Sequence, residues 1–532
     1  MSIRGMGRVA GLLAMAAIAT GLVTGLTFGQ TSTQTEAPQT QTPPPQTPGQ
    51  SIPVPGASGR SGQPATHITP EQAKELFDSV DTILKFASED SKLPIKTAVK
   101  KRLTTRDAVE KYLEEKMKDD KDARRMERSE IVLKKFGMLD EDFHLQPFLV
   151  SLLKEQIAGY YDSKTKTVNL LDWIAPDAQK PVMEHELTHA LQDQHVNLDK
   201  WEDQSSEDLS HNVAEDNKHI ATDEEDTARE AVLEGQAMAV LVDYQLKPVG
   251  GNILSNPDLV KKMADEQGSE ADSPVLARAP LVLHESLLFP YQDGLKFEVD
   301  MLADKGASGA FAGVLDRPPA TSYEIMNPRA YEREAKVPLL TMPDVHGLLD
   351  ANYAPYDVGV MGELDVRMLS ELFGGPQMAV ALTPAWNGGI YYAVQKKSAP
   401  DKNSTASIGL LYLSQWKSPQ AAETFAKMYA GELGQQYSGV VRDSQAESDP
   451  TEQIYKTSEG PVLIATQGNL VFVSESFDLP LARKLEFLMV AAQGGSGQNA
   501  ITARVRPTAN LTGGLVNFMA GCGMMRAALH LY

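Results

Sequence analysis

The chain has 532 residues, enough for more than one folded domain, and a formal net charge of −21. That charge excludes nucleic acid and anionic membrane surfaces as expected partners, because both would repel an acidic protein. Cys522 is the only cysteine, so no intramolecular disulfide can stabilise the fold.

The N-terminal segment has the pattern of an export signal. Arg4 and Arg8 precede an apolar stretch over residues 9–28. Cleavage could follow Ala19 or Gly29, but the stretch is also long enough to remain as an uncleaved membrane anchor. We therefore expect an exported protein in the periplasm, in the cell envelope or outside the cell.

Composition predicts how the chain is divided. After the signal or anchor at 1–29, residues 30–68 are rich in Pro, Gln and Thr and predict a disordered linker. The main folded domain is expected over 69–345, followed by a second domain over 346–495 and a flexible tail over 496–532. The expected fold class is α+β, with the first domain mainly helical.

Three helices and a hairpin are predicted first in the main domain. Thr69 followed by Pro70 is a helix-start pattern. Two apolar and β-branched runs, Gln156–Tyr161 and Thr167–Leu171, flank turn residues and predict a β-hairpin. The predicted helices cover residues 70–87, 105–117 and 121–136.

Residues 185–189 read His-Glu-Leu-Thr-His, an HExxH motif. Residues four apart share one face of a helix, so His185 and His189 can bind one Zn²⁺ while Glu186 contacts a metal-bound water. The uncharged neighbours predict a helix buried on most sides, with Pro181 in its first turn. The alternative is a structural helix with hydrogen-bonded histidines, but burying these polar groups without a partner is costly.

A catalytic zinc site needs a third protein ligand. His195 has the spacing of the third histidine in metzincins. However, Gln192 occupies the position where metzincins have a glycine, so the helix is expected to continue. On a continuous helix His195 would point away from the face of His189.

Glu234 is the favoured third ligand. It lies on a helix expected to begin with a capping box at Thr222 and Glu225 and to end near residue 244. Its neighbours at helical spacing are apolar, and a metal ion would offset the cost of burying this carboxylate. Glu230, one turn earlier, is the less favoured ligand or a partner that orients a histidine.

Two further predictions concern small residues next to Glu234 and the acidic segment that precedes them. Gly235 and Ala237 are small enough to let the two metal helices approach closely. The acidic run over 202–230 is interpreted as a solvated loop, with Ca²⁺ binding a weaker alternative because no EF-hand spacing is present.

Residues 182–191 and 233–237 resemble the two metal-binding helices of gluzincin metallopeptidases, members of the zincin superfamily. The resemblance extends over 156–244. It implies a zincin-like domain whose small antiparallel sheet offers an edge strand to an extended peptide. The alternative for this hairpin is an ordinary structural role, packed on the motif helix. Unlike the thermolysin branch, this chain has Met238 where an aspartate would orient a histidine.

The expected activity is hydrolysis of a peptide or protein substrate. One Zn²⁺ held by His185, His189 and Glu234 activates a water molecule, and Glu186 is the general base. Three readings stay open: this metallopeptidase, a catalytically inactive zincin-like binding protein of the cell envelope, and a zinc hydrolase with non-peptide substrates. The candidates for stabilising the oxyanion are Tyr244, His284 and Tyr291, and the sequence favours none of them.

The rest of the chain predicts a helix over 283–300 and an α+β module without a catalytic constellation. Substrate recognition, partner binding and simple stabilisation are its expected roles. Its predicted elements are a helix over 358–373, strands over 390–395 and 407–416, a helix from Ser418 to Tyr429, a hairpin pairing 462–466 with 470–473, and a helix over 481–492.

Overall fold

The computed structural model describes residues 67–494 except for 117–119, 157–158, 202–211 and 266–273. The predicted export segment, most of the linker and the C-terminal tail lie outside the described residues. Within the described part of the chain, no helix is both long enough and apolar enough to cross a membrane. The fold class is α+β, as predicted.

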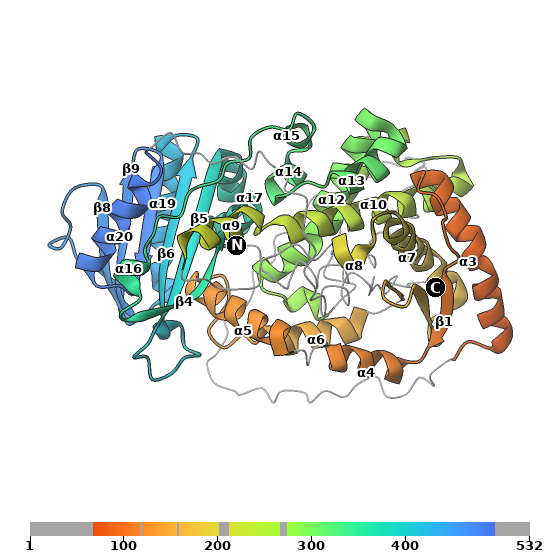
Figure 1. The fold of residues 1–532 in the computed structure, drawn as a ribbon, viewed down its shortest axis with the longest axis horizontal. Coiled ribbons are helices and arrows are strands. Elements are labelled where there is room, and N and C mark those ends of the chain that lie inside the picture. The colour runs from red at the N-terminus through yellow and green to blue at the C-terminus, as the bar shows by residue number, and fades with distance from the viewer. Residues whose placement is uncertain (1–66, 117–119, 157–158, 202–211, 266–273, 495–532) are drawn as a thin grey trace, which may run out of the picture.

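The first part of the chain is mainly helical (Figure 1). Its longer helices are α3 (Pro70–Ser91), α4 (Arg106–Lys116), α5 (Asp120–Lys135), α6 (Leu145–Gln156), α7 (Pro176–Val196), α9 (Val213–Thr222), α10 (Glu225–Leu246), α11 (Pro257–Asp265) and α12 (Leu281–Ser308). Short helical turns are α8 (Leu198–Trp201), η1 (Lys247–Val249), η2 (Ile253–Ser255), η3 (Leu276–Arg278), the π-helical turn η4 (Gly309–Gly313), α13 (Val314–Asp316), α14 (Ser322–Met326) and α15 (Pro328–Glu332).

A three-stranded sheet lies beside α7. Strands β2 (Tyr160–Asp162) and β3 (Thr167–Leu171) form the predicted antiparallel hairpin. A strand that the sequence did not predict, β1 (Lys100–Thr104), pairs in parallel with β3. The order is β1-β3-β2, so β2 is an edge strand. Strand β2 is shorter than the strand predicted over 156–161, because Gln156 is the last residue of α6.

The C-terminal part is built on a seven-stranded antiparallel sheet, at the left of Figure 1. Its strand order is β4-β5-β6-β10-β9-β8-β7. The strands are β4 (Tyr353–Val360), β5 (Trp386–Lys396), β6 (Ile408–Trp416), β7 (Val441–Arg442), β8 (Glu452–Thr457), β9 (Gly460–Gln467) and β10 (Leu470–Glu475). The helical elements are α16 (His346–Leu349), α17 (Glu363–Gly374), α18 (Pro376–Leu382), η5 (Thr383–Ala385), η6 (Thr405–Ser407), α19 (Pro419–Gln436) and α20 (Leu479–Ala491).

Both faces of this sheet are covered, because side chains alternate along each strand. On one face Tyr412 packs against Phe425 of α19. On the other face, Leu411 shares a hydrophobic cluster with Leu485 of α20. Phe136, next to α5, contacts the ring of Tyr412 as well, so one hydrophobic core continues from the helical part into the sheet.

Several predicted elements are confirmed. The Thr69 capping box with Gln72 opens α3, and Ser418 caps α19. The hairpin of β9 and β10 has the predicted pairing.

Two predicted helix starts are wrong. The helix α7 begins at Pro176, so Pro181 lies inside it rather than in its first turn. Thr222 ends α9, where its hydroxyl donates to backbone carbonyls of the preceding turn, and does not cap α10. The residue before α10 is Glu224, whose side chain makes no capping bond.

Two segment predictions are also wrong. The predicted helix over 358–373 starts as strand β4, which pairs with β5 before α17 begins. The acidic run is not simply a solvated loop, because its described portion forms α9 and the start of α10 and buries Asp216, Asp223 and Glu224.

The helices α10 and α12 cross closely at a pair of glycines. A Cβ atom on Gly235 would lie 2.3 Å from the carbonyl oxygen of Gly294, and one on Gly294 would lie 2.2 Å from that of Ala231. The prediction that Gly235 serves the approach of the two metal helices is therefore wrong, because Gly235 faces α12. The glycine instead fixes where α12 crosses beside Glu234.

Replacing Gly294 by alanine should destabilise the protein by about 1–3 kcal/mol, because the added methyl group must displace helix backbone. Urea unfolding of Gly294→Ala measures this change. Gly431→Ala is the control: Gly431 lies within α19, where an added methyl group would meet no atom within 4 Å, and the substitution should stabilise by about 0.5–1 kcal/mol. Equal stability of Gly294→Ala and the parent would contradict the close crossing.

Candidate metal centre

The helix α7 places the motif in the core. Its segment from Val182 to Asp193 is buried without interruption, and it packs against α3, α10 and β3. His185, Glu186 and His189 are at most 1% exposed. Because α7 continues to Val196, both histidines stay on one face, as the four-residue spacing predicts.

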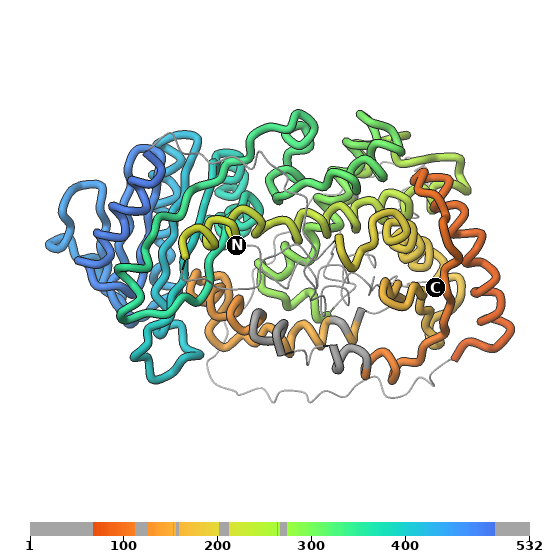
Figure 2. The backbone as a smooth tube through the Cα atoms, in the orientation of Figure 1, coloured from red at the N-terminus to blue at the C-terminus, as the bar shows by residue number. Residues whose placement is uncertain are grey.

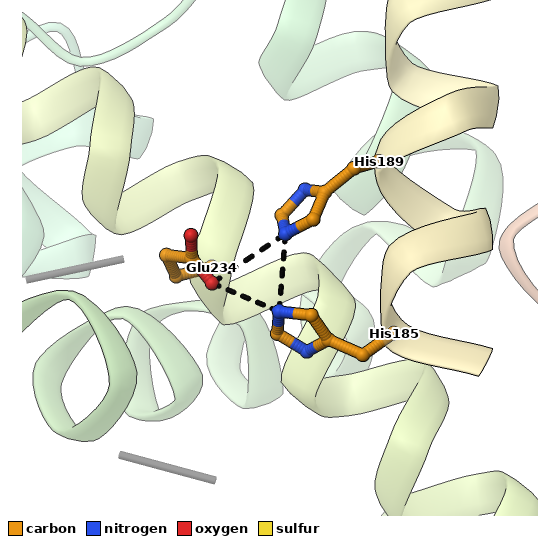
Figure 3. Close-up of side chains that lie close together, drawn as sticks. All are labelled: His185, His189 and Glu234. Carbon is orange, nitrogen blue, oxygen red and sulfur yellow. Dashed lines mark hydrogen bonds and ion pairs between the residues drawn. The ribbon is translucent and has the colours of Figure 1, made fainter. Parts of the chain in front are cut away.

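The helix α10 supplies the third residue. Glu234 is 1% exposed and lies in an apolar stretch of α10. Figure 3 shows its carboxylate pointing toward the two imidazoles, which come from α7. The structure therefore brings together the three residues predicted as metal ligands.

The three ligand atoms are close to one another. His185 Nε2 lies 3.0 Å from Glu234 Oε2 and 3.0 Å from His189 Nε2, and the remaining distance, His189 Nε2 to Glu234 Oε2, is 3.6 Å. Atoms about 2.0–2.2 Å from a tetrahedral metal ion lie about 3.3–3.6 Å apart. Small adjustments would therefore suffice, and this buried group can bind a metal ion.

Charge pairing dominates the electrostatics of the group. Burial alone would raise the pKa of Glu234, but the adjacent His189 and His185 outweigh it and lower the pKa to about 2. Burial alone would lower the pKa of His189, whereas Glu234 and Glu186 raise it to about 9. Glu234 and the His189 imidazole thus stabilise each other's charged forms, whereas at His185 burial outweighs Glu234 and lowers the pKa.

Glu186 adjoins both the metal-ligand group and the edge strand. Its Oε2 accepts a hydrogen bond of 2.8 Å from the backbone N–H of Tyr161 in β2. Its Oε1 has no hydrogen-bond partner among the described residues. Burial, together with the charge of Glu234, raises the pKa of Glu186 well above its usual value. The site therefore holds a carboxyl group with one unused oxygen.

Of the three oxyanion candidates, only Tyr291 lies at the site. Its ring stacks on His185 with 6.4 Å between centroids, and the side chain is fully buried. Burial and then the charges of Glu234, Glu230 and Glu186 raise its pKa well above 10. Tyr244 packs instead against Phe86, and His284 faces Glu285.

The two alternative ligands lie outside the group of converging atoms. His195 Nε2 is 3.0 Å from Asp316 Oδ1, so this imidazole faces away from the site. Glu230 is 8% exposed and influences Tyr291 electrostatically, but its side chain is not among the three that converge.

Sequence reasoning missed the partner of His189. Gln192 Oε1 lies 2.8 Å from His189 Nδ1. Comparison with the metzincin pattern shows only that Gln192 is not glycine. The signal that could have found its role is its position, because a buried glutamine three residues after His189 on a helix can reach that imidazole. Met238, where a thermolysin-like aspartate would stand, is buried and apolar, and His185 Nδ1 has no partner among the described residues.

Comparison with known proteins adds no assignment. No family model, no curated protein and no solved structure matches the chain.

We expect one metal ion per chain. Glu234→Ala should lose it, because two imidazoles alone remain, whereas His195→Asn should retain it. Metal content after dialysis, measured by plasma mass spectrometry, tests both variants. Loss of metal from His195→Asn with retention in Glu234→Ala would reverse the ligand assignment.

Proposed function

We propose that this protein is an exported zinc-dependent metallopeptidase. The observation that carries the proposal is the convergence of His185, His189 and Glu234, with the motif carboxylate Glu186 beside them. Two imidazoles and one carboxylate are a ligand set used by catalytic zinc, which keeps one position for water or substrate. A purely structural site would have no use for Glu186.

A bound zinc ion would supply Lewis-acid activation of water and of a substrate carbonyl. Glu186 would act as general base toward the attacking water and then return the proton to the leaving amine. Its unpartnered Oε1 is available for this role, while the N–H of Tyr161 holds Oε2 in place. The hydroxyl of Tyr291 would stabilise negative charge that develops on the carbonyl oxygen.

The edge strand supports peptides as substrates. Because β2 is at the edge of its sheet and the Tyr161 N–H is held by Glu186, an extended peptide that pairs with the remaining backbone groups of this edge would run beside the proposed general base. Such pairing recognises main chain and tolerates many sequences. This observation favours peptide bonds over other hydrolysable groups.

A second candidate is a metal-stabilised, zincin-like binding protein of the cell envelope without catalytic activity. The burial of the whole site favours it, because all three converging residues and Glu186 are at most 1% exposed. A metal enclosed in this way would contribute folding free energy. Hydrolysis assays on matched variants separate the two candidates.

Glu186→Gln should retain zinc and lower casein hydrolysis by a factor of about 10²–10⁴, because amide nitrogen cannot accept the proton. Glu184→Gln is the matched control. Glu184 is also fully buried two residues away, but it accepts a bond from Thr188 and burial raises its pKa well above its usual value, so an amide replaces it with little change. Full activity of Glu186→Gln would refute the general base, and a zinc-loaded parent without activity would favour the binding protein.

Tyr291→Phe should retain zinc and lower kcat by about 10²–10³ with little change in KM, because the lost hydroxyl acts in the transition state. Tyr244→Phe, whose ring packs against Phe86 rather than the ligand group, should behave like the parent. Steady-state kinetics on a chromogenic peptide distinguish the two variants. An unchanged kcat in Tyr291→Phe would remove this residue from the mechanism.

A further inference from the structure

Two glutamines connect His189 to the π-helical turn η4. Gln192 of α7 and Gln236 of α10 are both fully buried. Gln192 Nε2 donates to the backbone carbonyl of Leu233 at 3.0 Å and to Gln236 Oε1 at 2.9 Å. In turn, Gln236 Nε2 donates to the carbonyls of Ala310 and Phe311, at 3.0 and 3.2 Å. Every amide hydrogen of the pair therefore has an acceptor.

The backbone carbonyls at the ends of this hydrogen-bond relay determine which amide atoms donate and which accept. Backbone carbonyls only accept hydrogen bonds, so the groups that face Leu233, Ala310 and Phe311 must be the amide nitrogens. Flipping either amide would set oxygen against oxygen. Consequently Gln192 Oε1 faces His189, and the 2.8 Å contact requires a proton on His189 Nδ1. This holds whether the imidazole is neutral or charged.

We propose that Gln192 and Gln236 are positioning residues that fix His189 as the Nδ1–H tautomer and aim its Nε2 lone pair into the metal centre. The relay extends to η4, and π-helical turns occur often at functional sites. This inference deepens the proposed function and rests on the metal site. It assigns the orientation of His189 to two residues outside the ligand set.

The two histidines differ in this respect. His185 Nδ1 has no hydrogen-bond partner among the described residues, so no described group holds a proton on the ring nitrogen that faces away from Glu234. A histidine that donates its second ring N–H to a fixed acceptor is a better oriented ligand. His189 is thus the preorganised ligand of the pair.

The tautomer can be measured in the metal-free protein. Long-range ¹H–¹⁵N correlation spectra of the full chain, labelled at histidine, report which ring nitrogen carries the proton, and His189→Asn identifies the signal. In spectra recorded at alkaline pH, where the imidazole is neutral, the parent should show His189 with its single proton on Nδ1. A neutral His189 protonated on Nε2 alone would overturn the proposal, whatever the variants do.

Zinc affinity provides the second readout. Gln192→Met and Gln236→Met should each weaken zinc binding by about 10–100-fold, and the double variant should bind no more weakly than the weaker-binding single variant, because one relay is broken. Competition with a chromogenic chelator measures these affinities. Unchanged affinity in both single variants would overturn the proposal.

Gln179→Met is the matched control for a merely structural effect. Gln179 is a fully buried glutamine on the same helix, and its amide bonds only to backbone of Leu171 and Ile174. This variant should lose stability like Gln192→Met but keep the parent's zinc affinity and His189 tautomer. An equal loss of zinc affinity in Gln179→Met would mean that Gln192 and Gln236 affect zinc binding only by stabilising the fold, and would overturn the proposal. Absence of zinc binding in the parent would refute the proposed function, whereas the tautomer would still test the relay.

Discussion

The structure depends on burying two imidazoles and a carboxylate against one another. Desolvating such groups is expensive unless each finds a partner, and here His185, His189 and Glu234 are partners of one another. The surrounding helices are arranged to hold this contact. α7 carries both histidines on one face, α10 carries the glutamate, and α12 crosses α10 at a pair of glycines beside it. A metal ion bound between them could satisfy all three groups at once.

The C-terminal sheet also supports α10. Asp223, two residues before this helix begins, accepts a 2.6 Å bond from the backbone N–H of Val360 at the end of β4. Glu224 accepts a hydrogen bond from Ser322, and a Cβ on Gly362 would lie 2.2 Å from its carboxylate. Figures 1 and 2 show α9 beside the sheet and α10 leading away from it toward α7. The buried acids Asp223 and Glu224 therefore connect the C-terminal part of the chain to the helix that carries Glu234.

The ligand set was predictable from sequence because it follows from local geometry. Helical spacing brings His185 and His189 to one face, and the continuation of α7 past Gln192 turns His195 away. Glu234 could be selected because a carboxylate among apolar neighbours needs a partner. The hairpin and the cap of α3 were equally local.

The remaining features depend on tertiary contacts that have no local signal. From the sequence, Asp223 cannot be distinguished from a solvated acid, because its burial depends on the contact with β4. Likewise, the sequence of β4 predicts a helix, because its strand conformation depends on pairing with β5. The partner of Gly235 is on α12, far along the chain. The relay through Gln192 and Gln236 joins three segments, so no single stretch of sequence reveals it.

His185, His189 and Glu234 should hold one metal ion and leave one coordination position open. Zinc-edge anomalous diffraction from crystals grown with zinc tests it most directly. We expect a single strong peak, about 2.0–2.2 Å from both Nε2 atoms and the Glu234 carboxylate, with a non-protein fourth ligand. No peak between these three residues, or a fourth ligand supplied by the protein itself, would contradict it.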